Sequence, residues 1–144
     1  MSIIDILYAS LFGAAAMSMF TYSLSALLSR QFRQPVLLEK FLDIEDIRLP
    51  HFVKRILTWF AHISMGVILG IIYFYVTPEK YIYTWKAALL FGILGATFGI
   101  FVWALLLKCY RYEFKIDYNG FMIHLFFAHL IFAIAIIASL IYLI

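Results

Sequence analysis

Histidine is the residue type best able to do chemistry in the apolar parts of this chain. His62, His124 and His129 lie in long stretches that contain no Asp, Glu, Lys or Arg. At 1.5 Å per helical residue they lie about 10, 7 and 15 Å from the ends of these stretches, and we expect those ends on one side of a membrane. A neutral imidazole at such a depth can ligate haem iron or a metal ion, carry a proton, or link helices by hydrogen bonding.

His62 and His129 form the candidate cofactor-binding pair. On a helical wheel, His62 shares a narrow arc with Gly66, Gly70 and Tyr73, a face suited to close packing, so we expect this imidazole to point inward. His129 lies at a similar depth on another helix, and we expect the two rings to approach each other or a shared polar partner. Such a pair could ligate a b-type haem or bind a metal ion. The side chains that could assist a metal are Met17, Met19 and Ser64.

Two other interpretations of the histidines stay open. The rings could serve as hydrogen-bonding links between helices, which is a common role of neutral histidine in membranes. They could also act in a pH-sensitive or proton-handling role, because imidazole titrates near neutral pH. We expect no cofactor as the default and assign no metal site. The hydroxyl partners available for the linking role are Ser18, Thr21, Ser64 and Thr97.

Sequence motifs for catalysis are missing. The chain contains no G-x-S-x-G, H-E-x-x-H or C-x-x-C pattern, and its seven glycines form no phosphate-binding loop. Cys109 is the one cysteine, so no intrachain disulfide can form. We therefore assign no catalytic residues, and the sequence favours a protein that is not an enzyme.

The elements that must position the histidines are helices that cross a membrane. Of the 144 residues, 66% are hydrophobic and 13% are charged, and the mean hydropathy is +1.00. Charged residues are absent from four stretches, each long enough to span a bilayer, for which about 20 apolar residues suffice. The sequence thus predicts an all-α polytopic membrane protein, with four transmembrane helices in a compact bundle that forms a single domain over 1–144. The predicted spans are about 6–29, 56–78, 87–107 and 118–144.

Small residues recur along every predicted span. In lipid, helices pack through residues that let their backbones approach, and the spacing Gly-x-x-x-Gly is typical of such contacts. We expect these glycines to serve packing within the bundle, ahead of packing between two copies of the chain. The predicted packing glycines are Gly13, Gly66, Gly70, Gly92, Gly95 and Gly99.

The connection after the first span is the only one large enough for structure of its own. An apolar face that includes Leu37 and Phe41 predicts an amphipathic helix over about 35–48, ending before Pro50. We expect it to rest on the cytoplasmic bilayer surface, or, because its acidic cluster would be repelled by anionic lipid, to bind a partner protein or an adjacent protomer.

The basic residues are divided unequally between the two ends of the spans. Nine of the eleven Lys and Arg lie in the first and third connections. The positive-inside rule then places these connections in the cytoplasm and both termini outside, in the cell inner membrane. The net charge of +3 reflects this bias and indicates anionic lipid headgroups rather than nucleic acid as its counterpart.

The chain resembles the four-helix bacterial inner-membrane proteins typified by the YagU-like group. The resemblance runs almost end to end and rests on the residues from Gly13 to Met17, on Trp59-x-x-His62-x-x-x-Gly66-x-x-x-Gly70-x-x-Tyr73, on the glycines of the third span with Trp103, and on His129. It departs at Phe132-Ala133, where such proteins tend to have Tyr-Gly. The resemblance implies a four-helix membrane fold and carries no established activity.

The function expected from these features is that of a small non-catalytic integral membrane protein. It would self-associate or act as an accessory subunit of a larger membrane assembly. One alternative is an oligomeric channel or transporter for a small solute. Another is a haem- or metal-binding redox protein that uses His62 and His129.

Overall fold

The computed structural model describes residues 2–110 and 116–143, and the part of the chain that it describes is helical, with no strand. Four helices are long and apolar enough to cross a membrane, so the predicted all-α bundle with four spans is confirmed. A shorter helix follows the first of them. The elements are α1 (Ile3–Leu27), α2 (Gln34–Ile44), α3 (His51–Val76), η1 (Glu79–Tyr81), α4 (Trp85–Cys109) and α5 (Tyr118–Tyr142).

Side-chain caps fix where three of the long helices begin. Ser2 and Asp5 form a capping box at α1, and the Thr84 hydroxyl accepts from Ala87 N at α4. Asp117 caps α5 by accepting from Gly120 N at 3.1 Å. Such caps satisfy backbone donors that lack a partner in the first turn. With this cap at Asp117, Asn119 and Gly120 lie in the first turn of α5.

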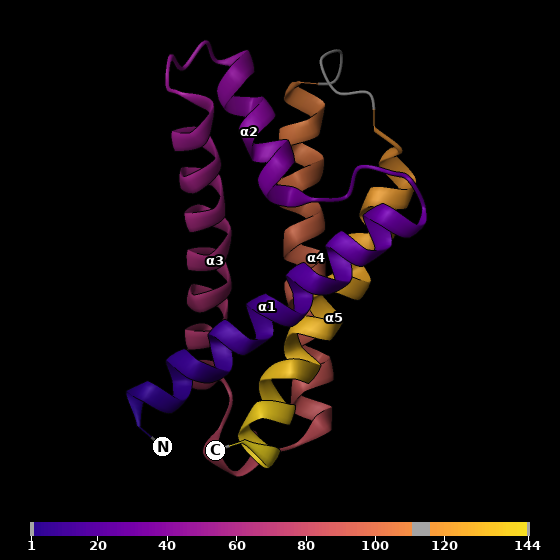
Figure 1. Cartoon of the computed structure of the whole chain (residues 1–144). Helices are drawn as coiled ribbons and strands as arrows, with labels where there is room; N and C mark the ends of the chain where they lie inside the picture. Colours follow the sequence, from indigo (N-terminus) through magenta and orange to yellow (C-terminus); the bar gives the residue numbers. More distant parts are fainter. Residues whose placement is uncertain (1, 111–115, 144) are drawn as a thin grey trace.

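α1 lies obliquely across the bundle, and α4 and α5 run beside each other (Figure 1). α5 packs against both α1 and α4, α1 also packs against α3, and α3 makes few direct contacts with α4. Both termini and η1 lie at one end of the bundle, called here the η1 end, and α2 lies at the other, called the α2 end. α5 is therefore the central helix and holds the largest share of buried side chains.

The helices meet through small residues. A Cβ added at Gly66 would lie 2.8 Å from Ala14 Cβ, and one added at Gly70 would lie 2.6 Å from Ser10 Cβ, so α1 and α3 touch almost backbone to backbone. Gly13 faces α5 in the same way, and Gly92 faces α5 from α4. All these contacts lie within one chain.

α2 packs its apolar face on other helices, whereas the sequence suggested contact with the bilayer surface or with a partner. It rises steeply beside α3 and α4 (Figure 1), and its Leu37 is 0% exposed. Leu37 and Phe41 belong to a buried cluster with Leu107 of α4 and Phe121 of α5. The apolar face of α2 is therefore covered by other helices of the same chain.

The acidic residues of α2 pair with the start of α3. Lys54 Nζ donates to Asp43 Oδ1 at 2.6 Å, and Glu39 pairs with His51. α2 ends at Ile44, four residues before the predicted end, because Asp46 has a φ of 49° that no α-helix can continue through. Asp43 and Glu39 thus make contacts inside the chain.

The alternating segment from Tyr110 to Tyr118, which the sequence suggests is extended, lies mostly outside the described residues.

Candidate functional site

Two histidines are bound by hydroxyl groups of α1. Ser18 Oγ lies 3.1 Å from His62 Nε2 on α3, and Thr21 Oγ1 lies 2.8 Å from His124 Nε2 on α5. Ser18 and Thr21 are three residues apart, so they share one face of α1. Through these two bonds α1 connects α3 to α5, which is the linking role considered from the sequence.

His124 is enclosed by aromatic rings. Its imidazole stacks between Phe20, at a centroid distance of 5.9 Å, and Phe32, at 5.1 Å. The side chain is fully buried and does not line a cavity among those described. His124 is therefore a packing and linking residue.

His129 has a fixed tautomer. Its Nδ1 lies 2.7 Å from the carbonyl oxygen of Leu125, and because a carbonyl can only accept, Nδ1 must carry the proton. Nε2 is then an acceptor with a free lone pair. The ring edge lies against α4, where a Cβ added at Gly99 would be 2.6 Å from Cε1, and one added at Gly95 would be 3.5 Å from Cδ2. The two glycines thus leave room on α4 for an imidazole of α5.

His62 and His129 line one cavity of about 320 Å³. We call it the histidine cavity. All five α-helices contribute to its wall. The cavity lies between α3 and α4, which make few direct contacts with each other. None of the described residues in its wall is Asp, Glu, Lys or Arg. The wall includes His62, His129, Gln34, Gly66, Gly99 and Trp103.

Gln34 is the site residue that the sequence analysis missed. It is the first residue of α2, it lines the histidine cavity, and it is 3% exposed. Its Nε2 and Oε1 are buried and have no hydrogen-bond partner among the described residues. A buried amide without a partner costs free energy that a bound polar group would recover. In the sequence, Gln34 before Pro35 is typical of a helix start, and no sequence pattern indicates that the Gln34 side chain is buried.

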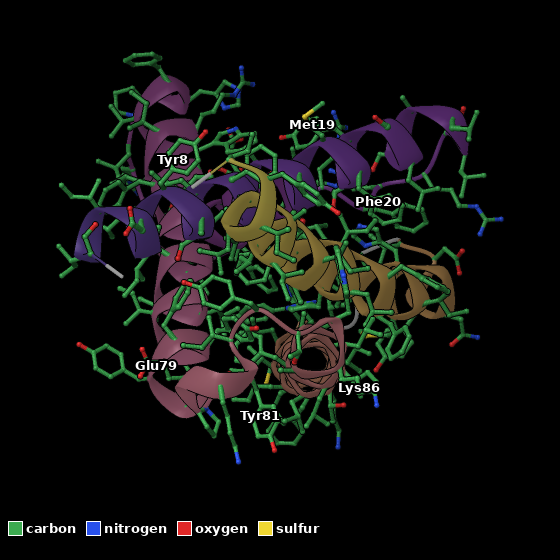
Figure 2. The ribbon with its side chains drawn as sticks, turned by 90° about the horizontal axis from the view of Figure 1, so that it is seen from below. Tyr8, Met19, Phe20, Glu79, Tyr81 and Lys86 are labelled. Atoms are coloured by element: carbon green, nitrogen blue, oxygen red, sulfur yellow. The ribbon has the colours of Figure 1, made fainter. Side chains whose placement is uncertain are left out.

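The two methionines that the sequence offers as additional metal ligands lie in different surroundings. Met17 lines the histidine cavity, whereas Met19 points outward from α1 and is 72% exposed (Figure 2). Met19 therefore cannot assist a metal ion in this cavity, which corrects the sequence expectation. Among the described residues no three His, Cys, Asp or Glu side chains lie together. Of the two histidines, His129 offers a free Nε2, and His62 would have to release Ser18 to use its own Nε2.

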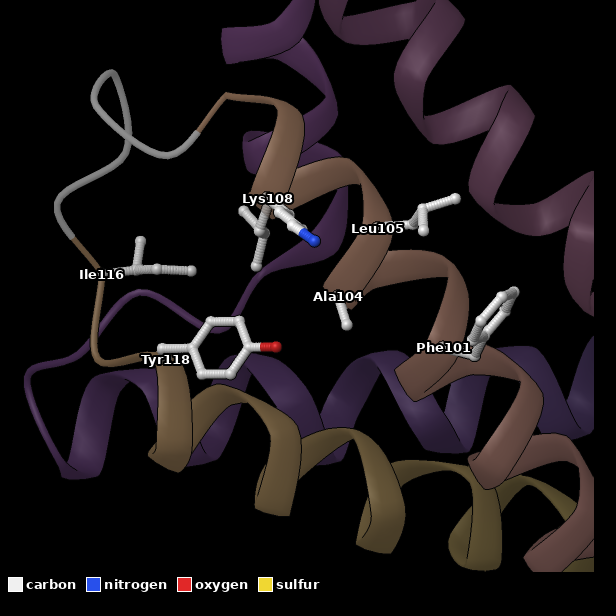
Figure 3. Close-up of a pocket in the computed structure, with 7 residues that line it drawn as sticks. Phe101, Ala104, Leu105, Lys108, Ile116 and Tyr118 are labelled. Carbon is white, nitrogen blue, oxygen red and sulfur yellow. The ribbon is translucent and has the colours of Figure 1, made fainter.

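A larger hollow of about 690 Å³ lies on the outer side of α4, next to the start of α5 (Figure 3). Phe101, Leu105 and Tyr118 form its wall and are all largely exposed, as expected of a surface that faces lipid. Lys108 is its one charged group among the described residues. It contains none of the predicted site residues, so we assign the candidate site to the histidine cavity.

No protein-family model, curated protein or solved structure matches the chain.

Proposed function

We propose that the protein is a non-catalytic, multi-pass membrane protein that binds a neutral, lipid-soluble small molecule in the histidine cavity. The observation that carries this proposal is that Gln34, whose enclosed amide has no partner among the described residues, lies in the wall of the same apolar cavity as His62 and His129. Mostly apolar walls with a few polar groups are typical of small-molecule sites.

Access to the cavity would be from the bilayer. Ala61 and Met65 of α3 and Phe98 of α4 line the cavity and are also exposed on the outside of the bundle. These three residues, called here the mouth, are apolar, so a molecule dissolved in lipid could enter between α3 and α4 without crossing water. A charged solute would find no counter-charge there.

We infer an inner-membrane location with the α2 end in the cytoplasm and both termini outside. The support is the excess of Lys and Arg in the two connections at the α2 end. The histidine cavity, which includes Gln34 at the start of α2, would then open in the cytoplasmic half of the bilayer.

We also propose that the protein works with partners, as a homo-oligomer or as an accessory subunit of a membrane assembly. The packing glycines face helices of the same chain. Association would therefore use large apolar side chains on the outer side of α4, such as Leu90, Leu94 and Phe101, which are about 60% exposed. The resemblance to the YagU-like group implies a fold and no role, and it stays a prediction.

Haem binding is the second candidate, and the free Nε2 of His129 favours it. Its test is an absorption spectrum of the protein purified from its own membranes. A haem protein will be coloured, and His62→Ala will remove the colour. A colourless parent protein would contradict this candidate and leave the first one in place.

Native mass spectrometry in mild detergent tests the first candidate. We expect the parent protein to carry one small neutral molecule from the membrane, and Ala61→Trp, which fills the mouth, to lose it. The matched control is Ile68→Trp, on the lipid-exposed side of the same helix and outside the cavity wall. A parent without such a molecule, or equal retention by both variants, would contradict the proposal. The same spectra report the oligomeric state.

A further inference from the structure

We propose that the histidine cavity binds the flat head of a para-quinone or its quinol, with the lipid tail leaving through the mouth. This inference rests on the proposed function and names the class of ligand. It concerns binding alone, and four properties of the cavity lead to it: charge, hydrogen-bonding capacity, shape and connection to the bilayer.

The charge of the wall requires a neutral head. No acidic or basic side chain occurs among the described wall residues. An ion taken from water into such surroundings would lose its hydration without gaining a counter-ion. Carboxylates, phosphates and amines are thereby disfavoured, whereas a quinone and a quinol are both neutral.

The hydrogen-bonding capacity of the wall matches both redox forms. The Gln34 amide offers two N–H donors and a carbonyl acceptor, and none of them is used by the described residues. His129 adds an acceptor, because its proton is on Nδ1 and bonded to Leu125. Both amide atoms of Gln34 are enclosed by protein, so a rotation of this side chain into the cavity is needed before a quinone carbonyl can accept from Nε2 or a quinol hydroxyl can donate to Oε1. His129 Nε2 can accept from a quinol hydroxyl without such a rotation. An apolar lipid could satisfy none of these atoms.

The shape of the wall suits a flat ring. Gly66 on α3 and Gly99 on α4 belong to the wall, and the space that a Cβ would fill there is taken by Ala14 and by the His129 ring. Phe98, Trp103 and Phe132 line the same cavity and offer aromatic surface for stacking. A sterol or a branched acyl chain would use such surfaces less well than a planar six-membered ring.

The cavity is large enough for the head of such a molecule and too small for its tail. Its volume of about 320 Å³ lies at the lower end of the range for small-molecule sites. A substituted ring fits in such a space, and a long isoprenoid or alkyl chain does not. The chain would pass Met65 and Phe98, both more than half exposed, and continue among the lipid tails.

Trp103 supplies a fluorescent probe in the wall. In a Trp59→Phe, Trp85→Phe background it is the one tryptophan of the chain. Quinones quench indole fluorescence at short range, so titration with decylubiquinone in lipid nanodiscs should give saturable quenching with one site per chain. Decylubiquinol, which quenches less, should compete with it.

Gln34→Leu tests the polar contacts. The substitution keeps the size of the side chain and removes the amide, and we expect the affinity for decylubiquinone to fall about tenfold or more. Gln31→Leu is the matched control, because Gln31 lies three residues earlier, bonds Arg33 and is outside the cavity wall, and it should bind as the parent does. Ala61→Trp should abolish binding from an exposed position, where the fold is least affected.

A competitor without oxygen atoms separates failure of this inference from failure of the proposed function. If n-decylbenzene displaces the quinone as well as the quinol does, and Gln34→Leu binds normally, the cavity is a general apolar site and the quinone assignment is overturned. If neither compound affects Trp103 in a saturable manner, the proposed small-molecule function is overturned as well.

Discussion

Two threonines of this bundle, Thr21 and Thr97, use their hydroxyl groups for different hydrogen bonds. Thr21 is 0% exposed and bonds His124 on another helix, whereas Thr97 is exposed and bonds the carbonyl of Ile93 in its own helix. The first bond links two helices at a buried position. The second contributes nothing between helices, so the pair allows a matched comparison.

We predict that Thr21→Val lowers the free energy of unfolding by about 1–2 kcal/mol, because it leaves the His124 ring without its hydroxyl partner in a buried site. Thr97→Val should change it by less than about 0.5 kcal/mol. Thermal unfolding in detergent, followed by circular dichroism, measures both. Equal melting of the two variants would mean that the α1–α5 bond does not stabilise the bundle.

At the scale of elements, the glycines set how closely the helices approach. At Gly70 an added Cβ would meet Ser10 Cβ at 2.6 Å and the Ser10 backbone Cα at 3.2 Å, so relief requires one helix to move. At Gly95 an added Cβ would meet only His129 Cδ2, at an ordinary contact distance of 3.5 Å. Gly70 and Gly95 look alike in the sequence, but only Gly70 lies where a larger side chain has no room.

We predict that Gly70→Ala destabilises the protein by about 1–3 kcal/mol, because overpacking pushes α1 away from α3. Gly95→Ala should leave stability unchanged or raise it by up to about 1 kcal/mol, because alanine favours the helix. Melting temperatures in one detergent compare them directly. A Gly70→Ala protein as stable as the parent would show that α1 and α3 are not in backbone contact.

The position of α2 can be tested in the same way. Leu37 is buried among side chains of the bundle, so Leu37→Ala should cost about 2–3 kcal/mol through the cavity it leaves. Lys40→Ala, at an exposed position of the same helix, is the control and should cost little. If α2 only touched lipid, Leu37→Ala would be as mild as the control, because lipid and helix surfaces are similarly apolar.

The sequence predicts the spans and not the place of α2, and the reason is physical. An uncharged run of more than twenty residues has one stable environment, so its location follows from composition. The apolar face of 34–44 only requires an apolar neighbour, and the pattern cannot distinguish lipid from α4 and α5. Burial of Gln34 depends on how several helices meet, and the His129 tautomer depends on one carbonyl. His62 and His129 could be paired from depth and helical phase, but the cavity that joins them could not.

The whole molecule has two unlike ends. The connections at the α2 end hold nine Lys and Arg, and the termini and η1 at the other end are accompanied by Lys80 and Lys86. Basic residues near a span resist transfer across the membrane during insertion, whereas acidic residues have little effect. The charge difference should therefore set one orientation for every helix, and with it the leaflet in which the mouth opens.

We predict that Tyr83→Cys reacts with a membrane-impermeant maleimide in intact cells and that Ile47→Cys reacts only after lysis, both in a Cys109→Ser background. Each position is exposed, Tyr83 lies at the η1 end and Ile47 at the α2 end, and neither substitution changes the number of basic residues. A reporter that is active only outside the cytoplasm, fused after Ile144, should be active. The reverse labelling pattern would invert the bundle, place the mouth in the outer leaflet, and require any quinone to reach Gln34 from that side.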